Sequence, residues 1–301
     1  MARYPHQEVR SVHELIEAVH RSTESWNCEG HIRPWFRGQA DAGEPPLPSV
    51  LRISNTSRRV LRYDEFHMTT LFRLKAPAFG QVPDTSRLDQ WLFLMQHCGL
   101  PTRLLDWTEN PLAACFFAAS RASESEKLRE RYSDRTYMAV WVLHPIMLNV
   151  LSDRRWNDFL NTWTQGPCLE NFKIAFGTAG RDKIPQPEGG YHTFQPTQLP
   201  IAVQPSTVAA RVAVQRSCFT VHGTDPRDFE ALFLGKRGSR RYLKKFVLRR
   251  SRAKELVGQL EQLGVSDSTL YPDFDGLARE MKRRFLLKPV DRRGSTTLKL
   301  G

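Results

Sequence analysis

Apolar residues recur at helical spacing in several parts of the chain. In residues 11–26 the apolar residues fall on one face of a helix that would begin after Ser11. Glu14 lies three positions after Ser11, which is the capping-box pattern. We therefore expect a capped first helix here. The segments 61–80 and Leu88–His97 predict two more helices.

Other segments have the composition and alternation of strands. Residues 136–145, "TYMAVWVLHP", are rich in β-branched and aromatic residues and end at a proline, which predicts a buried strand. Residues 210–223, "ARVAVQRSCFTVHG", alternate and predict a strand or hairpin. Residues 31–42 predict a strand that runs into a turn, with Arg37 at or near the strand end.

The segment "QHCGLPTRLLDWTENPLAACFFAAS" at 96–120 predicts a helix end, a polar loop and a buried helix. Gly99 is expected to end the first helix. Asp106 or Thr108 is expected to cap the second, with Pro111 tolerated in its first turn.

The C-terminal part contributes one more clear helix, at 252–265, which is expected to end at Gly264. Residues 166–205 have little periodicity and predict long loops with short strands. We expect a single α/β (α+β) domain over residues 8–286, a mixed sheet with flanking helices, followed by a basic, disordered tail at 287–301.

Composition excludes several classes of protein. No run of roughly 18 apolar residues is present, so we expect a soluble, cytoplasmic chain with no membrane partner. The five cysteines contain no CxxC pair, which favours reduced thiols over a disulfide framework or structural zinc, and we predict no metal. The usual dinucleotide, P-loop, zincin and α/β-hydrolase motifs are absent.

Positive charge is concentrated late in the chain. The whole chain has 44 Lys and Arg against 32 Asp and Glu, a formal charge of +12, and residues 236–254 alone hold ten basic and no acidic residues. This segment predicts contact with nucleic acid through phosphates and aromatic stacking. The alternative is a strand with a solvated basic face, followed by a helix. The candidate contacts are Arg240, Arg241, Lys244, Lys245, Arg249 and Arg250.

Polar residues lie directly against the most apolar run of the chain. His97, Arg103 and Asp106 precede it, and buried charges are costly unless they are paired, so we expect a polar site here. A structural alternative is an ion-pair network of Arg37, Arg103 and Asp106. Cys98 beside His97 suggests a nucleophile and base, but a buried thiol is the commoner arrangement.

Four segments together resemble the FRG-domain family, which is named for a Phe-Arg-Gly motif. They are "WFRGQ" at 35–39, "QHCGLPTRLLDWTENPLAACFFAAS" at 96–120, "RVAVQRSCFTVHG" at 211–223 and "TLYPDFDGLAREM" at 269–281. The resemblance extends over nearly the whole chain. The sequence departs from the family at Cys98, where an aromatic residue is usual, and in "RSCF", where a glycine commonly precedes the Phe.

A second resemblance is to ADP-ribosyltransferases, including DarT-like enzymes that modify nucleic acid. An Arg-Gly strand, a polar turn before a helix, and a late strand with a polar residue are similar in order. The resemblance implies a mixed sheet of the ADP-ribosyltransferase type, NAD as substrate, and catalytic roles for Arg37, Asp106 and Gln215. The implied NAD-binding residues are Arg37, Gly38, Gln39, His97, Thr102, Arg103, Trp107 and Thr108.

The resemblance implies a role for several of these residues. Arg37 suits a clamp for the pyrophosphate, because its planar fork matches phosphate geometry. Polar residues of 102–108 orient Arg37 or the ribose hydroxyls, and Trp107 is either an aromatic wall or a core residue. Gln215 positions a ribose hydroxyl, since an amide is no general base.

The sequence leaves the activity open between three readings. The first is an NAD-dependent ADP-ribosyltransferase acting on nucleic acid, for which the resemblance suggests a toxin or antiviral role. The second is a non-enzymatic module that binds nucleic acid or a nucleotide. The third is a protein-directed transferase. Asp273 and Asp275 are expected to serve as turn and helix-cap residues.

Overall fold

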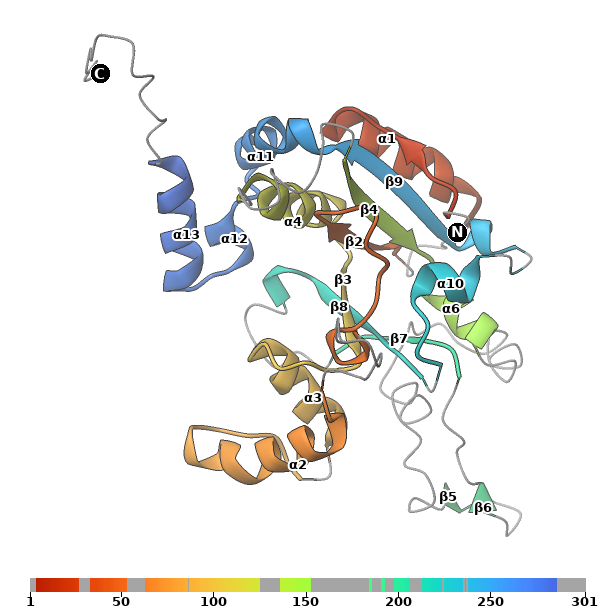
Figure 1. Cartoon of the computed structure of the whole chain (residues 1–301), viewed down its shortest axis with the longest axis vertical. Helices are drawn as coiled ribbons and strands as arrows, with labels where there is room; N and C mark the ends of the chain where they lie inside the picture. Colours follow the sequence, from red (N-terminus) through yellow and green to blue (C-terminus); the bar gives the residue numbers. More distant parts are fainter. Residues whose placement is uncertain are drawn as a thin grey trace, which may run out of the picture.

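A mixed seven-stranded sheet forms the centre of the computed structural model, in the order β1-β9-β4-β2-β3-β8-β7 (Figure 1). The structure describes residues 4–26, 33–52, 63–85, 87–124, 136–152, 184–185, 191–192, 198–205, 213–223, 225–234, 236 and 238–285. The strands are β1 (Gln7–Glu8), β2 (Trp35–Gln39), β3 (Leu104–Thr108), β4 (Tyr137–Leu143), β7 (Ile201–Val203), β8 (Ser217–Val221) and β9 (Leu243–Arg249). Neighbouring strands are antiparallel, except that β1 pairs with β9 in parallel.

Helices flank this sheet, as the sequence predicts. The described α-helices are α1 (Val12–Thr23), α2 (Glu65–Lys75), α3 (Leu88–His97), α4 (Pro111–Glu124), α6 (Pro145–Ser152), α10 (Phe229–Phe233), α11 (Ala253–Gln262), α12 (Asp267–Leu270) and α13 (Phe274–Arg284). A separate pair of short strands comprises β5 (Ile184–Pro185) and β6 (Tyr191–His192). The α/β class with a mixed sheet is confirmed.

The hydrophobic core has a layer on each face of the sheet. One layer joins α1, α4 and α11 to alternate residues of β4 and β9, such as Val140 and Phe246. The other contains Trp35, Trp107 and Trp141 from three strands, covered by residues of α6 and α10. A third cluster packs α3 against β3, β7 and β8. The alternation of side chains along β4 explains why the whole strand is apolar: both of its faces are covered.

Most predicted elements are present. Ser11 caps α1 by accepting a hydrogen bond from the Glu14 amide, although the Glu14 carboxylate turns to the Arg10 amide. The predicted helix at 88–97, the buried strand at 136–145 and the helix at 252–265 are confirmed. Gly264 ends the last of these with a positive φ of 81°. The helix expected at 61–80 is shorter, with α2 followed by a 3₁₀ turn, η3 (Ala76–Ala78).

Three local expectations are wrong. The polar loop at 102–108 is largely strand β3, because its Leu and Trp side chains enter the core while backbone groups pair with β8. Asn110 caps α4, not Asp106 or Thr108: its side chain accepts from the Leu112 amide at 2.9 Å. The late strand begins only at Ser217, so Gln215 lies in the turn that precedes it.

Other predictions fall on parts of the chain that are not described. Much of 166–205 and the tail at 286–301 lie outside the described residues, as do Cys28 and Cys168. The domain limits 8–286 stay a prediction. Within the described parts, no helix has the length and apolar character needed to cross a membrane. The same parts contain no group of three or more His, Cys, Asp or Glu placed to hold a metal ion.

Candidate functional site

Arg37 connects two strands at the point where they separate. β2 pairs with β4 along five residues but with β3 only at Phe36 opposite Thr108. Beyond that pair, Arg37 Nη1 donates a hydrogen bond of 2.7 Å to the carbonyl oxygen of Asp106. The expected contact of Arg37 with residues 102–108 is therefore present. The guanidinium thereby joins β2 to β3 beside their one backbone pair.

The Arg37 guanidinium is largely buried and only partly compensated. Its side chain is 15% exposed, and Nη1 lies 3.9 Å from Asp106 Oδ2. Nε is buried and has no hydrogen-bond partner among the described residues. Burial lowers the pKa of Arg37 to about 10, so the group stays charged at neutral pH. A buried cation with a free donor favours a bound anion.

Asp106 presents its carboxylate to solvent beside this cation. The side chain is 57% exposed, and Gln96 Nε2 donates to both of its oxygens at 3.0 Å. The Thr102 hydroxyl in turn donates to Gln96 Oε1 at 2.5 Å. Thr102 and Gln96 thus fix the carboxylate next to Arg37. Sequence reasoning missed Gln96, although it opens the quoted 96–120 segment.

Arg103 takes part in a different cluster. Its Nε donates to both carboxylate oxygens of Glu65 on α2, at 2.9 and 3.0 Å, and Nη1 donates to the carbonyl of His222. Of the ion-pair network considered from the sequence, Arg37 does pair with Asp106 at 3.9 Å, but the inclusion of Arg103 is wrong, because Arg103 pairs with Glu65. Arg103 joins α2 to the start of β3 and the end of β8. Glu65 gave no recognisable signal in the sequence.

The remaining residues of β3 point into the core or stabilise a turn. Trp107 is buried at 2% exposure and its indole N–H donates to Thr220 Oγ1, which favours the core alternative over an aromatic wall. The Thr108 hydroxyl donates to the Gln215 carbonyl at 2.6 Å. Gln215 is itself buried, and its amide donates to the Leu270 carbonyl. Gln215 thereby fixes the start of β8 to α12.

The glycine of the Phe-Arg-Gly motif permits close packing of α4. A Cβ at Gly38 would lie 1.8 Å from the Ala114 carbonyl oxygen and 2.8 Å from the Ala118 nitrogen. Phe36 enters the same core layer as α4. In this motif, Phe36 therefore packs in the core, Arg37 bonds to β3, and Gly38 leaves room for α4.

The sequence model of one family matches this region, from β2 to the end of α4. It is the FRG domain, matched at residues 33–127. Residues 33–127 form an FRG domain. The match contains "WFRGQ" and the whole 96–120 segment, whereas the segments at 211–223 and 269–281 lie beyond it. Comparison with curated proteins and with solved structures returned no match.

Two other candidate residues flank the centre of the FRG domain. Gln39 Oε1 accepts a hydrogen bond from the Trp141 indole N–H, and its amide donates to the Glu44 carbonyl. His97 is the exposed last residue of α3. The neighbouring Cys98 is also exposed, so the expected buried thiol is wrong for this cysteine.

Much of the basic segment that follows the FRG domain is engaged within the fold. Lys245 is buried, pairs with Glu230 and donates to the Ala42 carbonyl at 2.9 Å. Arg249 pairs with Glu8 at 3.0 Å, and Arg250 donates to the Ala122 carbonyl at 3.4 Å. The alternative reading is right that a strand, β9, is followed by a helix, α11. Its solvated basic face is wrong, because β9 is an inner strand of the sheet and both of its faces are largely covered.

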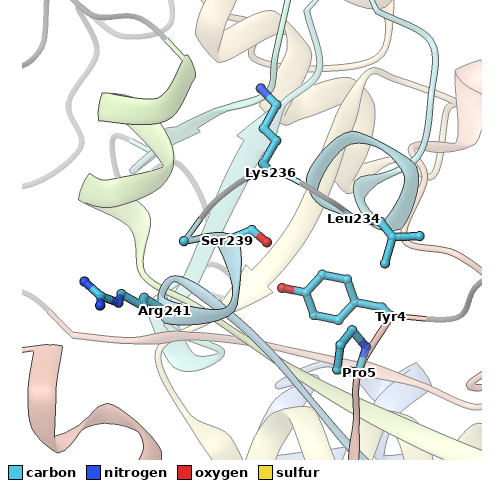
Figure 2. Close-up of a pocket in the computed structure, with 7 residues that line it drawn as sticks. Tyr4, Pro5, Leu234, Lys236, Ser239 and Arg241 are labelled. Atoms are coloured by element: carbon cyan, nitrogen blue, oxygen red, sulfur yellow. The ribbon is translucent and has the colours of Figure 1, made fainter.

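Two other cations of this segment, Lys236 and Arg241, are among the residues that line a cavity of about 290 Å³. Its lining residues are Tyr4, Pro5, Leu234, Lys236, Gly238, Ser239 and Arg241. Figure 2 shows the Tyr4 and Ser239 hydroxyls facing one another, while Lys236 and Arg241 extend outward. Lys244 on β9 is half-buried, and burial lowers its pKa. The Arg240 side chain lies outside the described residues.

A buried histidine next to the Arg103 cluster predicts acid sensitivity. His222 is fully buried against Phe229, and neither ring nitrogen has a hydrogen-bond partner in the described structure. Burial, with Arg103 nearby, lowers its pKa to about 3. The unfolded chain takes up this proton below about pH 6.5, whereas the folded chain does not. The stability is therefore complete above pH 6.5 and falls as the pH drops toward 3.

We expect the free energy of unfolding to fall by about 1.4 kcal/mol per pH unit on account of His222. Burial also lowers the pKa of His144, to about 4, which adds a similar slope down to that pH. Urea titrations between pH 7.5 and 5 measure the combined slope of the unfolding free energy that the two histidines cause. His222→Leu should remove about half of the slope, and an unchanged slope in this variant contradicts the assignment.

Proposed function

We propose that the FRG domain binds NAD at Arg37 and transfers its ADP-ribose group. One observation carries the proposal. The Arg37 guanidinium is largely buried, its Nε has no partner among the described residues, and its Nη1 lies 3.9 Å from the Asp106 carboxylate. That carboxylate is exposed to solvent, and Gln96 and Thr102 hold it in place. A fixed cation suits the pyrophosphate of NAD, and a fixed carboxylate suits a positive charge that develops nearby. The resemblance to ADP-ribosyltransferases assigns the same role to Arg37.

The chemistry requires little beyond these two groups. The bond between the ribose C1′ and the nicotinamide nitrogen breaks, and its electron pair leaves with nicotinamide, which becomes neutral. The ribose is left with oxocarbenium character, which the Asp106 carboxylate stabilises. An acceptor oxygen or nitrogen then bonds to C1′ and releases its proton to Asp106 or water. Gln215 has no part in this step, since its amide is engaged by Leu270.

Nucleic acid is the acceptor class that the charge distribution favours. Lys236 and Arg241 extend outward at the cavity and form no ion pair within the described residues (Figure 2), and Lys244 follows on β9. These cations can contact phosphates, whereas Lys245 and Arg249 are engaged in ion pairs. A nucleic-acid-modifying transferase in the cytoplasm fits a toxin or antiviral effector.

A non-enzymatic nucleotide-binding module is the second candidate. The observation in its favour is that Arg37 already donates to the Asp106 carbonyl, so one arm of the guanidinium has a structural partner. Such a module binds NAD or another nucleotide but releases no nicotinamide. A protein-directed transferase would release nicotinamide and leave nucleic acid unlabelled.

Replacing Asp106 with asparagine separates these candidates. We expect nicotinamide release from NAD to fall about 100-fold in Asp106→Asn, because the charge that stabilises the developing cation is lost. The melting temperature should stay near that of wild type, since the side chain is 57% exposed. Glu17→Gln, an exposed change on α1, is the matched control. The assay follows nicotinamide and radiolabelled ADP-ribose with DNA, RNA or no acceptor.

Each outcome of this assay has a clear meaning. Release that depends on Asp106, with label on DNA or RNA, supports the proposal. Release with label on protein alone favours the protein-directed transferase. A wild-type chain that binds NAD without releasing nicotinamide is a binding module, and equal rates in wild type and Asp106→Asn remove Asp106 from the mechanism.

A further inference from the structure

The last described helix, α13, packs against α12 through its polar face. Glu280 accepts hydrogen bonds from the Ser266 hydroxyl at 2.7 Å and the Ser268 amide at 3.0 Å. Arg283 pairs with Asp267 at 2.5 Å, and Gly276 is buried. A Cβ at Gly276 would lie 2.0 Å from the Tyr271 carbonyl oxygen, so the helix packs closely on this side.

The opposite face of α13 is apolar and points to solvent. Phe274 is 91% exposed, Leu277 46% and Phe285, which follows the helix, 70%, while Met281 is half-buried. These four residues are spaced by three, four and four positions, so they form one stripe along the helix. Figure 1 shows α13 at the outer edge of the molecule, beside α12. An amphipathic helix normally buries this face, and here the packing is reversed.

Charges beside the apolar stripe are arranged by sign along the helix. Asp273 and Asp275 lie at its beginning, and Lys282 and Arg284 lie at its end. At 100° per residue, Asp275 and Lys282 share one flank of the stripe, and Arg284 lies on the other. Asp273 precedes the helix on the side of Arg284, and its carboxylate caps the helix by accepting from the Gly276 amide at 2.7 Å. Each flank therefore carries a negative charge at the beginning of the helix and a positive charge at its end.

We propose that this surface binds a second copy of the chain, with the two α13 helices antiparallel about a twofold axis. In an antiparallel helix pair each flank faces the same flank of its partner, so Asp275 would meet Lys282 of the partner subunit. Asp273 would likewise meet Arg284 of the partner subunit. Phe274 would then pack on the partner's Phe285, and Leu277 on the partner's Met281. All four pairs are centred between residues 278 and 280, as one isologous axis requires.

Complementary charge is what selects a second copy over other occupants. An anionic surface would be repelled by the aspartates at the beginning of the helix, and a basic partner by Lys282 and Arg284 at its end. The stripe is short, so the interface is small and a micromolar dissociation constant is expected.

Sedimentation velocity of the full chain over about 1–300 µM tests the proposal, because this range brackets micromolar dimerisation. Wild type should pass from monomer to dimer, and Leu277→Asp should stay monomeric. Lys282→Glu should weaken the dimer at least tenfold without affecting folding, because the residue is exposed. The exchange Asp275→Lys with Lys282→Asp should restore it. Phe79→Asp, at an 88% exposed residue of η3, should change nothing.

Three results would overturn the inference: a wild-type chain that is monomeric throughout this range, a dimer that persists in Leu277→Asp, or a charge exchange that fails to recover what Lys282→Glu loses. The last of these results would exclude the antiparallel arrangement in particular. Only in an antiparallel pair does each flank face the same flank of the partner, so only there does exchanging the two charges form the ion pair again.

Discussion

Gly38→Ala is expected to destabilise the chain by about 3 kcal/mol or more, the upper part of the range for overpacking in a core. The new methyl group would lie 1.8 Å from the Ala114 carbonyl oxygen. This neighbour is helix backbone, so no side chain can rotate to make room. To relieve the clash, α4 would have to move away from β2, and it forms much of one core layer. Urea unfolding monitored by circular dichroism measures the change.

Gly258→Ala is the matched control for this experiment. Gly258 lies within α11, and nothing lies within 4 Å of a Cβ placed there. Alanine at an open helical position is expected to stabilise by about 0.5–1 kcal/mol. Equal effects of the two substitutions would contradict the packing role of Gly38.

The second large effect is expected at Arg37, where substitution should abolish ligand binding but lower the stability only modestly. Arg37→Ala removes the hydrogen bond to the Asp106 carbonyl, which should cost about 1.5–3 kcal/mol of stability. A larger loss would follow if Asp106 were a buried partner, but its side chain is 57% exposed and keeps Gln96. The variant should therefore fold and lose NAD binding.

Arg37→Lys keeps the charge and removes the planar fork. Lysine cannot donate both to the strand carbonyl and, in bidentate fashion, to a phosphate. We expect a melting temperature near that of wild type and turnover reduced tenfold or more. Thermal unfolding and nicotinamide release, measured on the same preparation, distinguish a ligand clamp from a residue that only joins β2 to β3. A folded Arg37→Lys variant with full activity would contradict the clamp.

The sequence predicted elements well where the periodicity was strong. It predicted α1 and α11, whose apolar residues follow the helical period throughout, and β4, whose run of β-branched and aromatic residues is typical of a buried strand. It failed at residues 104–108, where Thr and Asp beside Leu and Trp suggested a loop. There, pairing with β8 decides the structure, and that pairing joins residues far apart in the chain.

The sequence also predicted only part of the candidate site. The proximity of Arg37 to residues 102–108 followed from the motifs, whereas the partners of the charges did not. Glu65 engages Arg103 across 38 residues of the chain, and Glu230 engages Lys245 across 15, so each pair joins two separate elements and no local pattern reveals it. The basic segment suggested a continuous surface because its charge was counted along the chain, although β9 is an inner strand.

The most direct test of the account is calorimetric titration of NAD into the wild-type chain and into Arg37→Lys at neutral pH. We predict one NAD site per chain in wild type and at least tenfold weaker binding in Arg37→Lys, with both proteins folded, because the bidentate contact with the pyrophosphate is lost. Absence of NAD binding to folded wild type, or equal affinity in the two proteins, would contradict the assignment of Arg37 as the centre of an NAD site.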